Sequence, residues 1–129
     1  DESTMRTRKS LMYYRDILFH EFENKCFYCG NTVQIGKVEV DHFIPWSFIK
    51  DDNLWNFVLA CRSCNNKKRD KLADLMYLEQ IEKRNAILVE RNRINANCRV
   101  ARITNIYNWA RQNGYSEIWL PNKVSDKNE

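Results

Sequence analysis

Residues 26–71 read CFYCGNTVQIGKVEVDHFIPWSFIKDDNLWNFVLACRSCNNKKRDK and contain four of the five cysteines in the chain. The four form two CxxC pairs, and 31 residues separate the pairs. A two-residue spacer lets each pair deliver two thiolates from one tight turn, and tetrahedral Zn(II) binds four such soft ligands. The spacing therefore predicts a structural zinc site whose ligands are Cys26, Cys29, Cys61 and Cys64.

Two other uses of these cysteines are less favoured. A disulfide framework belongs to secreted proteins, but the sequence shows no apolar signal segment and neighbouring CxxC cysteines make poor structural bridges. A redox site would need only one CxxC pair. Cys98 stands apart, and we expect it to pack as a small buried thiol. The thiols indicate a reducing compartment, so we expect a cytoplasmic protein.

The size and composition of the chain fit one folded domain. It has 129 residues, of which 43% are hydrophobic and 12% aromatic, enough for a single core. With only 3 Gly and 2 Pro, long irregular loops and multi-stranded sandwiches are disfavoured. Only 2 His are present, too few for a His-rich metal site. The chain begins at Asp1 and not at Met, so it is also compatible with a piece of a larger protein.

Apolar spacing predicts the elements around the first cysteine pair. Apolar residues recur every three or four positions in a helix over about 5–24, and His20 near its end is expected to be a packing or surface residue. Gly30 can supply the positive φ that a CxxC turn often needs. A hairpin turn at Gly36 and Lys37 should lead into a strand that includes Val38 and Val40.

The second half of the motif predicts a loop, a strand and a helix. Residues 43–55 read as a loop, and residues 57–60 as a short apolar strand. A helix should begin near Cys64 and carry the basic residues that follow the last cysteine pair. Beyond the motif, over about 72–114, two helical stripes follow, and Gly114 should cap the second helix. Their members are Leu72, Leu75, Leu78 and Ile81, then Val100, Ile103, Ile106, Tyr107 and Ala110.

Polar residues capable of chemistry lie between and directly after the cysteine pairs. Asp41 and His42 come at the end of the first predicted strand, and Asn65 follows the last cysteine. Carboxylate and amide oxygens suit Mg(II), which prefers oxygen ligands and keeps several waters. A neutral imidazole near pH 7 suits removal of a proton from water. The combination favours metal-assisted hydrolysis of a phosphodiester, with His42 as the general base.

The order of these residues resembles the HNH endonuclease superfamily. The matching string is Cys26-x2-Cys29, x11, Asp41-His42, x13, Asn56, x4, Cys61-x2-Cys64-Asn65, x2, Lys68. Residues 41–52 also look like the corresponding loop in the HNH domain of RNA-guided CRISPR effectors. The resemblance covers about residues 26–71, roughly a third of the chain. It implies an α+β fold in which a zinc-stapled ββα-metal core is flanked by an N-terminal helix and C-terminal helices.

The resemblance also implies a role for each matching residue. Asp41 and Asn65 would bind the catalytic metal, His42 would be the general base, Asn56 would fix the loop that holds His42, and Lys68 would contact phosphate. The family name implies a final histidine where this chain has Asn65. An amide oxygen there should favour Mg(II) or Mn(II) over Zn(II) or Ni(II). Asn66 is the alternative ligand, and Asn65 is preferred because it directly follows the cysteine.

Basic residues gather after the last cysteine pair. The formal net charge is +4, but four thiolates and one zinc would remove about two units. The distribution of charged residues along the chain is therefore a better guide to binding partners than the net charge. Such a cluster is usually a solvated helix face, and here it also suits phosphate contact. We expect Trp46 and Trp55 to pack beside the site more readily than to stack on bases. The cluster consists of Arg62, Lys67, Lys68, Arg69 and Lys71.

Three functions remain compatible with the sequence. The preferred one is an endonuclease that hydrolyses DNA, expected to be double-stranded, to 5′-phosphate and 3′-hydroxyl ends as the family implies. The alternatives are a non-catalytic zinc-ribbon DNA-binding module and a zinc-stapled protein-docking domain. One HNH site cuts one strand, so a double-strand cut would need a homodimer, successive nicks or other domains of a larger effector. The resemblance to the family favours restriction or antiviral defence as the biological setting. No membrane association is expected.

Overall fold

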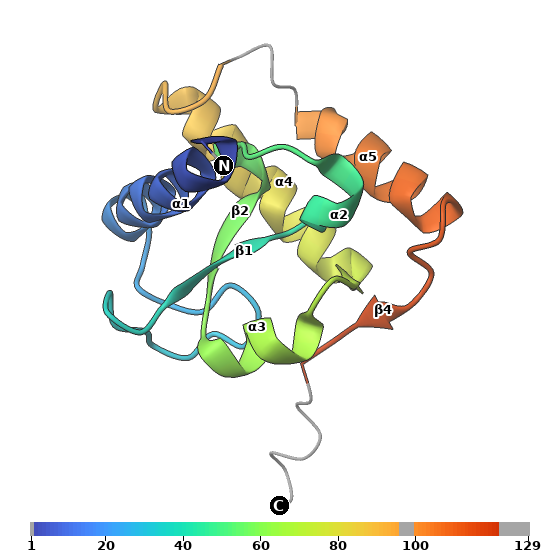
Figure 1. Ribbon diagram of the computed structural model, residues 1–129, viewed down its shortest axis with the longest axis horizontal. Coiled ribbons are helices and arrows are strands. Elements are labelled where there is room, and N and C mark those ends of the chain that lie inside the picture. The colour runs from blue at the N-terminus through green and yellow to red at the C-terminus, as the bar shows by residue number, and fades with distance from the viewer. Residues whose placement is uncertain (1, 96–99, 122–129) are drawn as a thin grey trace, which may run out of the picture. The chain divides into compact units, whose positions relative to one another are not determined.

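The computed structural model describes residues 2–95 and 100–121, with side chains over 11–95 and 102–121. The expected buried thiol Cys98 lies outside these ranges. Helices combine with two small two-stranded sheets, which confirms the α+β class (Figure 1). The described residues form two compact units: unit 1 is made of 2–41, 58–69 and 120–121, and unit 2 of 42–57, 70–95 and 100–119.

Unit 1 begins with helix α1, Glu2–Glu21, which ends three residues earlier than the sequence predicts. The reason lies in the turn that follows. Lys25 forms an antiparallel bridge with Thr32, and the Cys26 N–H donates to the Asn31 carbonyl at 2.8 Å. These bonds fold the chain back on itself before the first cysteine, so the helix cannot continue. Gly30 has φ 80°, which confirms the positive φ expected in this turn.

Strands β1, Glu39–His42, and β2, Phe57–Ala60, form the first sheet. The bounds of β2 are those predicted. Val38 was predicted in the first strand and lies just outside it, because its N–H donates to the Gln34 carbonyl at 2.8 Å and closes the turn. The Phe27 N–H donates to the Leu59 carbonyl at 2.8 Å. The first cysteine turn is thereby bonded to β2.

Helix α3, Arg62–Lys68, begins two residues before the predicted start. Cys61 caps it, since its Sγ accepts a bond from the Cys64 N–H at 3.4 Å. Arg69 has φ 56° and stops the helix, so Arg69 and Lys71 do not lie on it. The prediction that one helix carries the whole basic cluster is therefore wrong. Figure 1 shows β2 leading directly into α3.

Unit 2 starts with the segment predicted as a loop, which contains two short helical turns. Helix α2 spans Trp46–Ile49, and the 3₁₀ turn η1 spans Leu54–Asn56. The Pro45 carbonyl accepts the first bonds of α2, and Lys50 ends the helix at φ 56°. Neither turn is long enough to show a helical period in the sequence, which explains why the sequence predicts only a loop.

Leu72 was predicted on a helix and lies instead in strand β3, Leu72–Ala73. This strand pairs in parallel with β4, Ile118–Trp119. The Asp74 carboxylate then caps helix α4, Leu75–Glu90, by accepting from the Met76 N–H at 3.0 Å. Leu75 at its start is 51% exposed, so it is not part of the predicted core stripe.

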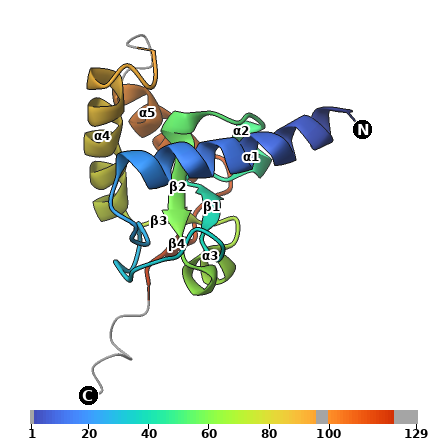
Figure 2. The same cartoon turned by 90° about the vertical axis from the view of Figure 1, so that its left-hand side faces the viewer.

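Helices α4 and α5, Val100–Gln112, contact each other and contribute much of the core of unit 2 (Figure 2). Gly114 has φ 104° directly after α5, as expected of a residue that closes a helix. None of the described helices is long and apolar enough to cross a lipid bilayer. The helices bury Tyr77, Leu78, Ile81 and Leu88 from α4, and Ile103, Tyr107 and Ala110 from α5.

Candidate functional site

The four cysteines predicted as zinc ligands come together in unit 1. Their Sγ atoms all lie within 4.8 Å of one another, and those of Cys29 and Cys61 are 3.9 Å apart. Four sulfurs at about 2.3 Å from a tetrahedral Zn(II) would be roughly 3.8 Å apart. Backbone N–H groups point at three of the sulfurs: Cys29 N at Cys26, Asn31 N at Cys29, and Cys64 N at Cys61. The cluster can hold one zinc ion.

The surroundings affect the thiols unequally. Burial raises the pKa of Cys64 far above its usual value, and the charge of Cys26 adds to this. Burial likewise raises the pKa of Cys29. Burial opposes ionisation of Cys26 as well, but backbone N–H groups, that of Cys29 first, lower its pKa overall. Four thiolates at this spacing repel one another, so their joint ionisation requires a cation between them.

Asp41 is buried in unit 1 and faces two donors. The carboxylate is 5% exposed as a residue, and Tyr28 Oη donates to its Oδ2 at 2.5 Å. Lys68 Nζ lies 3.1 Å from Oδ2 and 3.5 Å from Oδ1. The lysine is 0% exposed. An unpaired charge would be costly at this depth, and the ion pair and the phenol together offset the cost of burying the carboxylate.

The phenol of Tyr28 remains a hydrogen-bond donor over the whole physiological range. Burial raises its pKa well above 10.0, and the negative charge of Asp41 raises it further. Tyr28 lies between the two cysteines of the first CxxC pair. The turn that presents two zinc-site thiols therefore also presents the donor that holds Asp41.

Asn65, the second expected metal ligand, is held by a carboxylate in unit 1. Its Nδ2 donates to Glu39 Oε1 at 2.6 Å, while Arg62 Nε donates to Glu39 Oε2 at 3.2 Å. With the amide nitrogen fixed to Glu39, the Asn65 side-chain oxygen faces away from that bond. Asp41 and Asn65 are oxygen donors of the kind Mg(II) prefers, so the donor set fits that ion. Asn66, the alternative, is exposed.

His42, the expected general base, follows Asp41 in β1 and belongs to unit 2. Its Nε2 lies 2.7 Å from Asp52 Oδ1. The Phe57 ring meets the imidazole edge-on, with ring centroids 4.7 Å apart at 69°. Little of either polar side chain is exposed: 19% for His42 and 13% for Asp52. The imidazole is therefore fixed by a carboxylate and an aromatic ring.

Asn56 is fully buried in unit 2 and clamps the chain just after His42. Its Oδ1 accepts from the Ile44 N–H at 2.8 Å, and its Nδ2 donates to the Ile44 carbonyl at 2.9 Å. The Asn56 carbonyl also accepts from the Phe43 N–H at 2.8 Å. Asn56 thus bonds the backbone of both Phe43 and Ile44.

The basic cluster is divided between different environments. Arg62, Lys67 and Arg69 are exposed, whereas Lys68 is buried against Asp41. Lys71 lies 3.5 Å from Glu117 in unit 2. The exposed members can meet a polyanion directly, while the structure assigns Lys68 to Asp41.

The two tryptophans also differ. Trp55 is buried, in line with the expected packing role. Trp46 is 47% exposed, and Lys50 Nζ lies 5.7 Å from the centroid of its ring. The expectation that both tryptophans pack thus holds for Trp55 alone.

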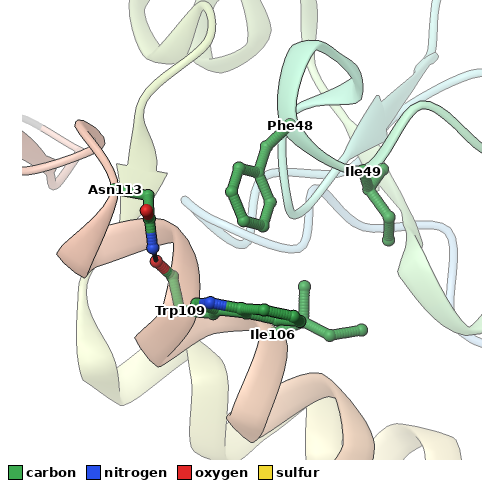
Figure 3. Close-up of a pocket in the computed structure, with 5 residues that line it drawn as sticks. All are labelled: Phe48, Ile49, Ile106, Trp109 and Asn113. Carbon is green, nitrogen blue, oxygen red and sulfur yellow. Dashed lines mark hydrogen bonds between the residues drawn. The ribbon is translucent and has the colours of Figure 1, made fainter.

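An apolar pocket of about 440 Å³ lies in unit 2. In Figure 3, Phe48 points toward Trp109, and the Asn113 amide donates to the Trp109 carbonyl at 2.7 Å. Among the described residues, those that line it carry no titratable group. Its lining residues are Phe48, Ile49, Ile106, Trp109 and Asn113.

Three residues with direct contacts to the expected site went unrecognised in the sequence: Tyr28, Glu39 and Asp52. Glu39 had a usable signal, because residues two apart in a strand share a face and Glu39 stands two before Asp41. The indication for Tyr28 was weaker and consisted of its place between the two cysteines of the first CxxC pair. Asp52 had none, since only the fold of the loop brings it to His42, ten residues earlier.

Comparison with known proteins identifies the segment that holds these residues. Residues 26–73 match the family model described as HNH endonuclease. The chain is also similar to the CRISPR-associated endonuclease Cas9 1 of Streptococcus thermophilus (strain ATCC BAA-491 / LMD-9), at 36% identity over 58 residues. That match covers 40% of this chain and 5% of the relative. The resemblance to the HNH endonucleases is confirmed for this segment.

Proposed function

We propose that this chain is a metal-dependent endonuclease that hydrolyses phosphodiester bonds of DNA. The observation that carries the proposal is the pair Asp41 and His42 at the end of β1, inside the segment that matches the HNH endonuclease model. The buried carboxylate faces Tyr28 and Lys68, and the imidazole faces Asp52. These contacts fix a carboxylate and an imidazole at neighbouring positions, and metal-assisted hydrolysis requires both groups.

His42 takes a proton from the attacking water in this mechanism. Water forms the new bond to phosphorus as its proton passes to the imidazole, and the bond from phosphorus to the 3′ oxygen breaks as that oxygen takes up a proton from solvent water. The products carry 5′-phosphate and 3′-hydroxyl ends. A positioned general base contributes about 10²- to 10⁴-fold to the rate of such a step. Asn56 keeps the backbone after His42 in place through its two bonds to Ile44.

Asp41 and Asn65 would hold the catalytic ion, Mg(II) or Mn(II). Such an ion supplies electrostatic stabilisation of the charge that develops on the phosphate and the leaving oxygen. Glu39 fixes the amide of Asn65, so that its oxygen and not its nitrogen is presented. The four cysteines would bind a structural Zn(II), which joins the two CxxC turns of unit 1.

The exposed basic residues would contact the DNA backbone. Exposed Arg62 stands three residues before Asn65 on α3, on the same face of the helix. Exposed Lys67 and Arg69 follow Asn65, so a phosphate near Asn65 would meet positive charge. This contact is independent of base sequence and should weaken as salt rises. Lys68 has a different role here: it neutralises Asp41.

The test compares the two histidines of the chain. His42→Ala should lower the rate of nicking of supercoiled plasmid by about 10²-fold or more in Mg(II), with plasmid binding retained. His20→Ala, which removes the exposed histidine near the end of α1, is the matched control and should cut at the wild-type rate. Equal rates for both variants would contradict the assignment of His42. If wild-type protein binds DNA but does not cleave it, the result would instead support the zinc-ribbon module. If wild-type protein neither binds nor cleaves DNA, the result would support the docking domain.

A further inference from the structure

The bond between His42 and Asp52 has a direction that bears on catalysis. A carboxylate can only accept a hydrogen bond, so the proton between Asp52 Oδ1 and His42 Nε2, 2.7 Å apart, belongs to the imidazole. A neutral imidazole carries one proton on its two nitrogens. With that proton on Nε2, Nδ1 keeps the lone pair and is the nitrogen able to accept a proton.

We infer that Asp52 is a positioning residue that fixes His42 in the tautomer with Nδ1 as the base. The inference rests on the proposed hydrolysis, because a tautomer matters only if His42 moves a proton. It adds a residue that lies outside the Asp41, His42, Asn56 and Asn65 set. A carboxylate that orients a histidine in this way acts through the ring and does not touch substrate.

The loop around Asp52 is built so that this carboxylate faces the ring. Asp51 Oδ1 accepts from the Asp52 N–H at 2.9 Å, and Asp51 Oδ2 accepts from Asn53 Nδ2 at 3.0 Å. The Asn53 carbonyl accepts from the Asn56 N–H at 2.9 Å. These bonds connect the Asp52 backbone to Asn56, the residue that also clamps the chain after His42. The acceptor and the imidazole are thus held by the same set of bonds.

The burial of Asp52 supports a functional reason for the contact. Among the described residues, its Oδ2 is buried and finds no hydrogen-bond donor. A carboxylate kept out of water with one oxygen unsatisfied costs stability, so a purely structural role would be better filled by an amide or an apolar side chain. On the ring side, Phe57 limits rotation of the imidazole and shields it from water. The bond between Asp52 and His42 is therefore strong and directional.

The experiment measures tautomer and turnover in the same variants of the full chain. With only 2 His, the ring nitrogens can be assigned by ¹⁵N NMR, and the exposed His20 serves as the internal reference. The spectra are taken well above the ordinary imidazole pKa. Wild-type His42 should show a protonated Nε2 and an unprotonated Nδ1. Asp52→Asn, whose amide can donate to Nε2, should shift the ring toward the Nδ1-protonated form.

Turnover should change with the tautomer. Asp52→Asn should lower kcat for plasmid nicking in Mg(II) by about 10- to 100-fold and leave KM near the wild-type value. Glu79→Gln, which removes an exposed carboxylate of α4 in the same unit, is the control and should change neither. A wild-type kcat in Asp52→Asn, or a wild-type ring protonated on Nδ1, would overturn the inference. If wild-type protein cuts nothing while its Nε2 is protonated and the variant's is not, the orientation by Asp52 stands and the proposed nuclease activity fails.

Discussion

Two donors face the buried carboxylate of Asp41 and offset the cost of its burial. The ammonium of Lys68 forms an ion pair with the carboxylate, and the phenol of Tyr28 donates a hydrogen bond that orients it. Both partners come from the segments that carry the CxxC pairs. Lys68 lies on α3 after Cys64, and Tyr28 lies between Cys26 and Cys29. The carboxylate is therefore oriented by the same two turns that bring the four thiols together.

Tyr28→Phe tests this support. Removing the hydroxyl leaves Asp41 Oδ2 with one donor fewer, and a buried bond to a charged group contributes about 1.5–3 kcal/mol. We expect the free energy of unfolding to fall by that amount in urea denaturation. The raised pKa of Tyr28 means that its contribution is complete below pH 10.0 and is lost as pH rises through its folded value, so the measurement belongs near neutrality.

The control for this variant is Tyr13→Phe, which removes a hydroxyl from a residue that is 62% exposed. Its unfolding free energy should equal that of the wild type. If both variants unfold alike, the bond between Tyr28 and Asp41 contributes nothing to stability.

Among the side chains, the sequence predicts the expected metal ligands and general base but misses the residues that form hydrogen bonds with them. Asp41, His42 and Asn65 are recognisable because their chemistry and spacing are distinctive. Asp52 and Tyr28 are an ordinary loop residue and an ordinary aromatic until folding places them 2.7 Å from His42 and 2.5 Å from Asp41. Lys68 was expected at phosphate, because a sequence does not tell a buried lysine from an exposed one.

The segment from β1 to β2 is the element that presents His42. Asn56 closes it by bonding both the N–H and the carbonyl of Ile44, and Asn85 of α4 donates to the Trp55 carbonyl at 2.8 Å. These bonds satisfy buried backbone groups that no sheet or helix pairs. The loop is consequently as fixed as a regular element.

Asn56→Ala tests the clamp. The change leaves two backbone groups of Ile44 buried without partners, and each such group costs about 1–3 kcal/mol. We expect the unfolding free energy to fall by about 2 kcal/mol or more, and nicking to slow because the chain after His42 is released. Asn108→Ala, at an exposed position of α5, should leave both quantities unchanged. A stable Asn56→Ala protein with wild-type nicking would show that the clamp is dispensable.

The elements that the sequence predicted well are those with a period or a chemical signal. Residues 57–60 form β2 as predicted, and Gly114 closes α5. The two-residue strands β3 and β4 were missed, since neither is long enough to show alternation and their pairing joins residues far apart in sequence. The start of α3 was placed two residues late because a cysteine, and not Ser, Thr, Asp or Asn, caps it.

Zinc should determine whether unit 1 is folded. The cysteines join the turn after α1 to the turn before α3, and the bond from Phe27 N to the Leu59 carbonyl connects the first turn to β2. In a unit this small, a structural metal supplies a large share of the folding free energy. Loss of zinc would also release Tyr28 and with it Asp41.

Removal of zinc by a chelator should therefore lower the thermal unfolding temperature and abolish nicking even when Mg(II) is restored. Adding one equivalent of Zn(II) should recover both. The measurements are circular dichroism on heating and a plasmid assay on the same samples. An unchanged unfolding temperature after complete zinc removal, verified by elemental analysis, would contradict a structural role for the cluster.

The most direct test of the proposed function is the initial rate of nicking of supercoiled plasmid by the zinc-loaded chain in Mg(II). We expect nicked circles to accumulate in Mg(II) or Mn(II), and none without added metal. Asp41→Ala should be inactive under every condition, since it removes an expected ligand of the ion. Nicking at the same rate without added metal, nicking only in Ni(II) or excess Zn(II), or full activity in Asp41→Ala would contradict the proposed metal site.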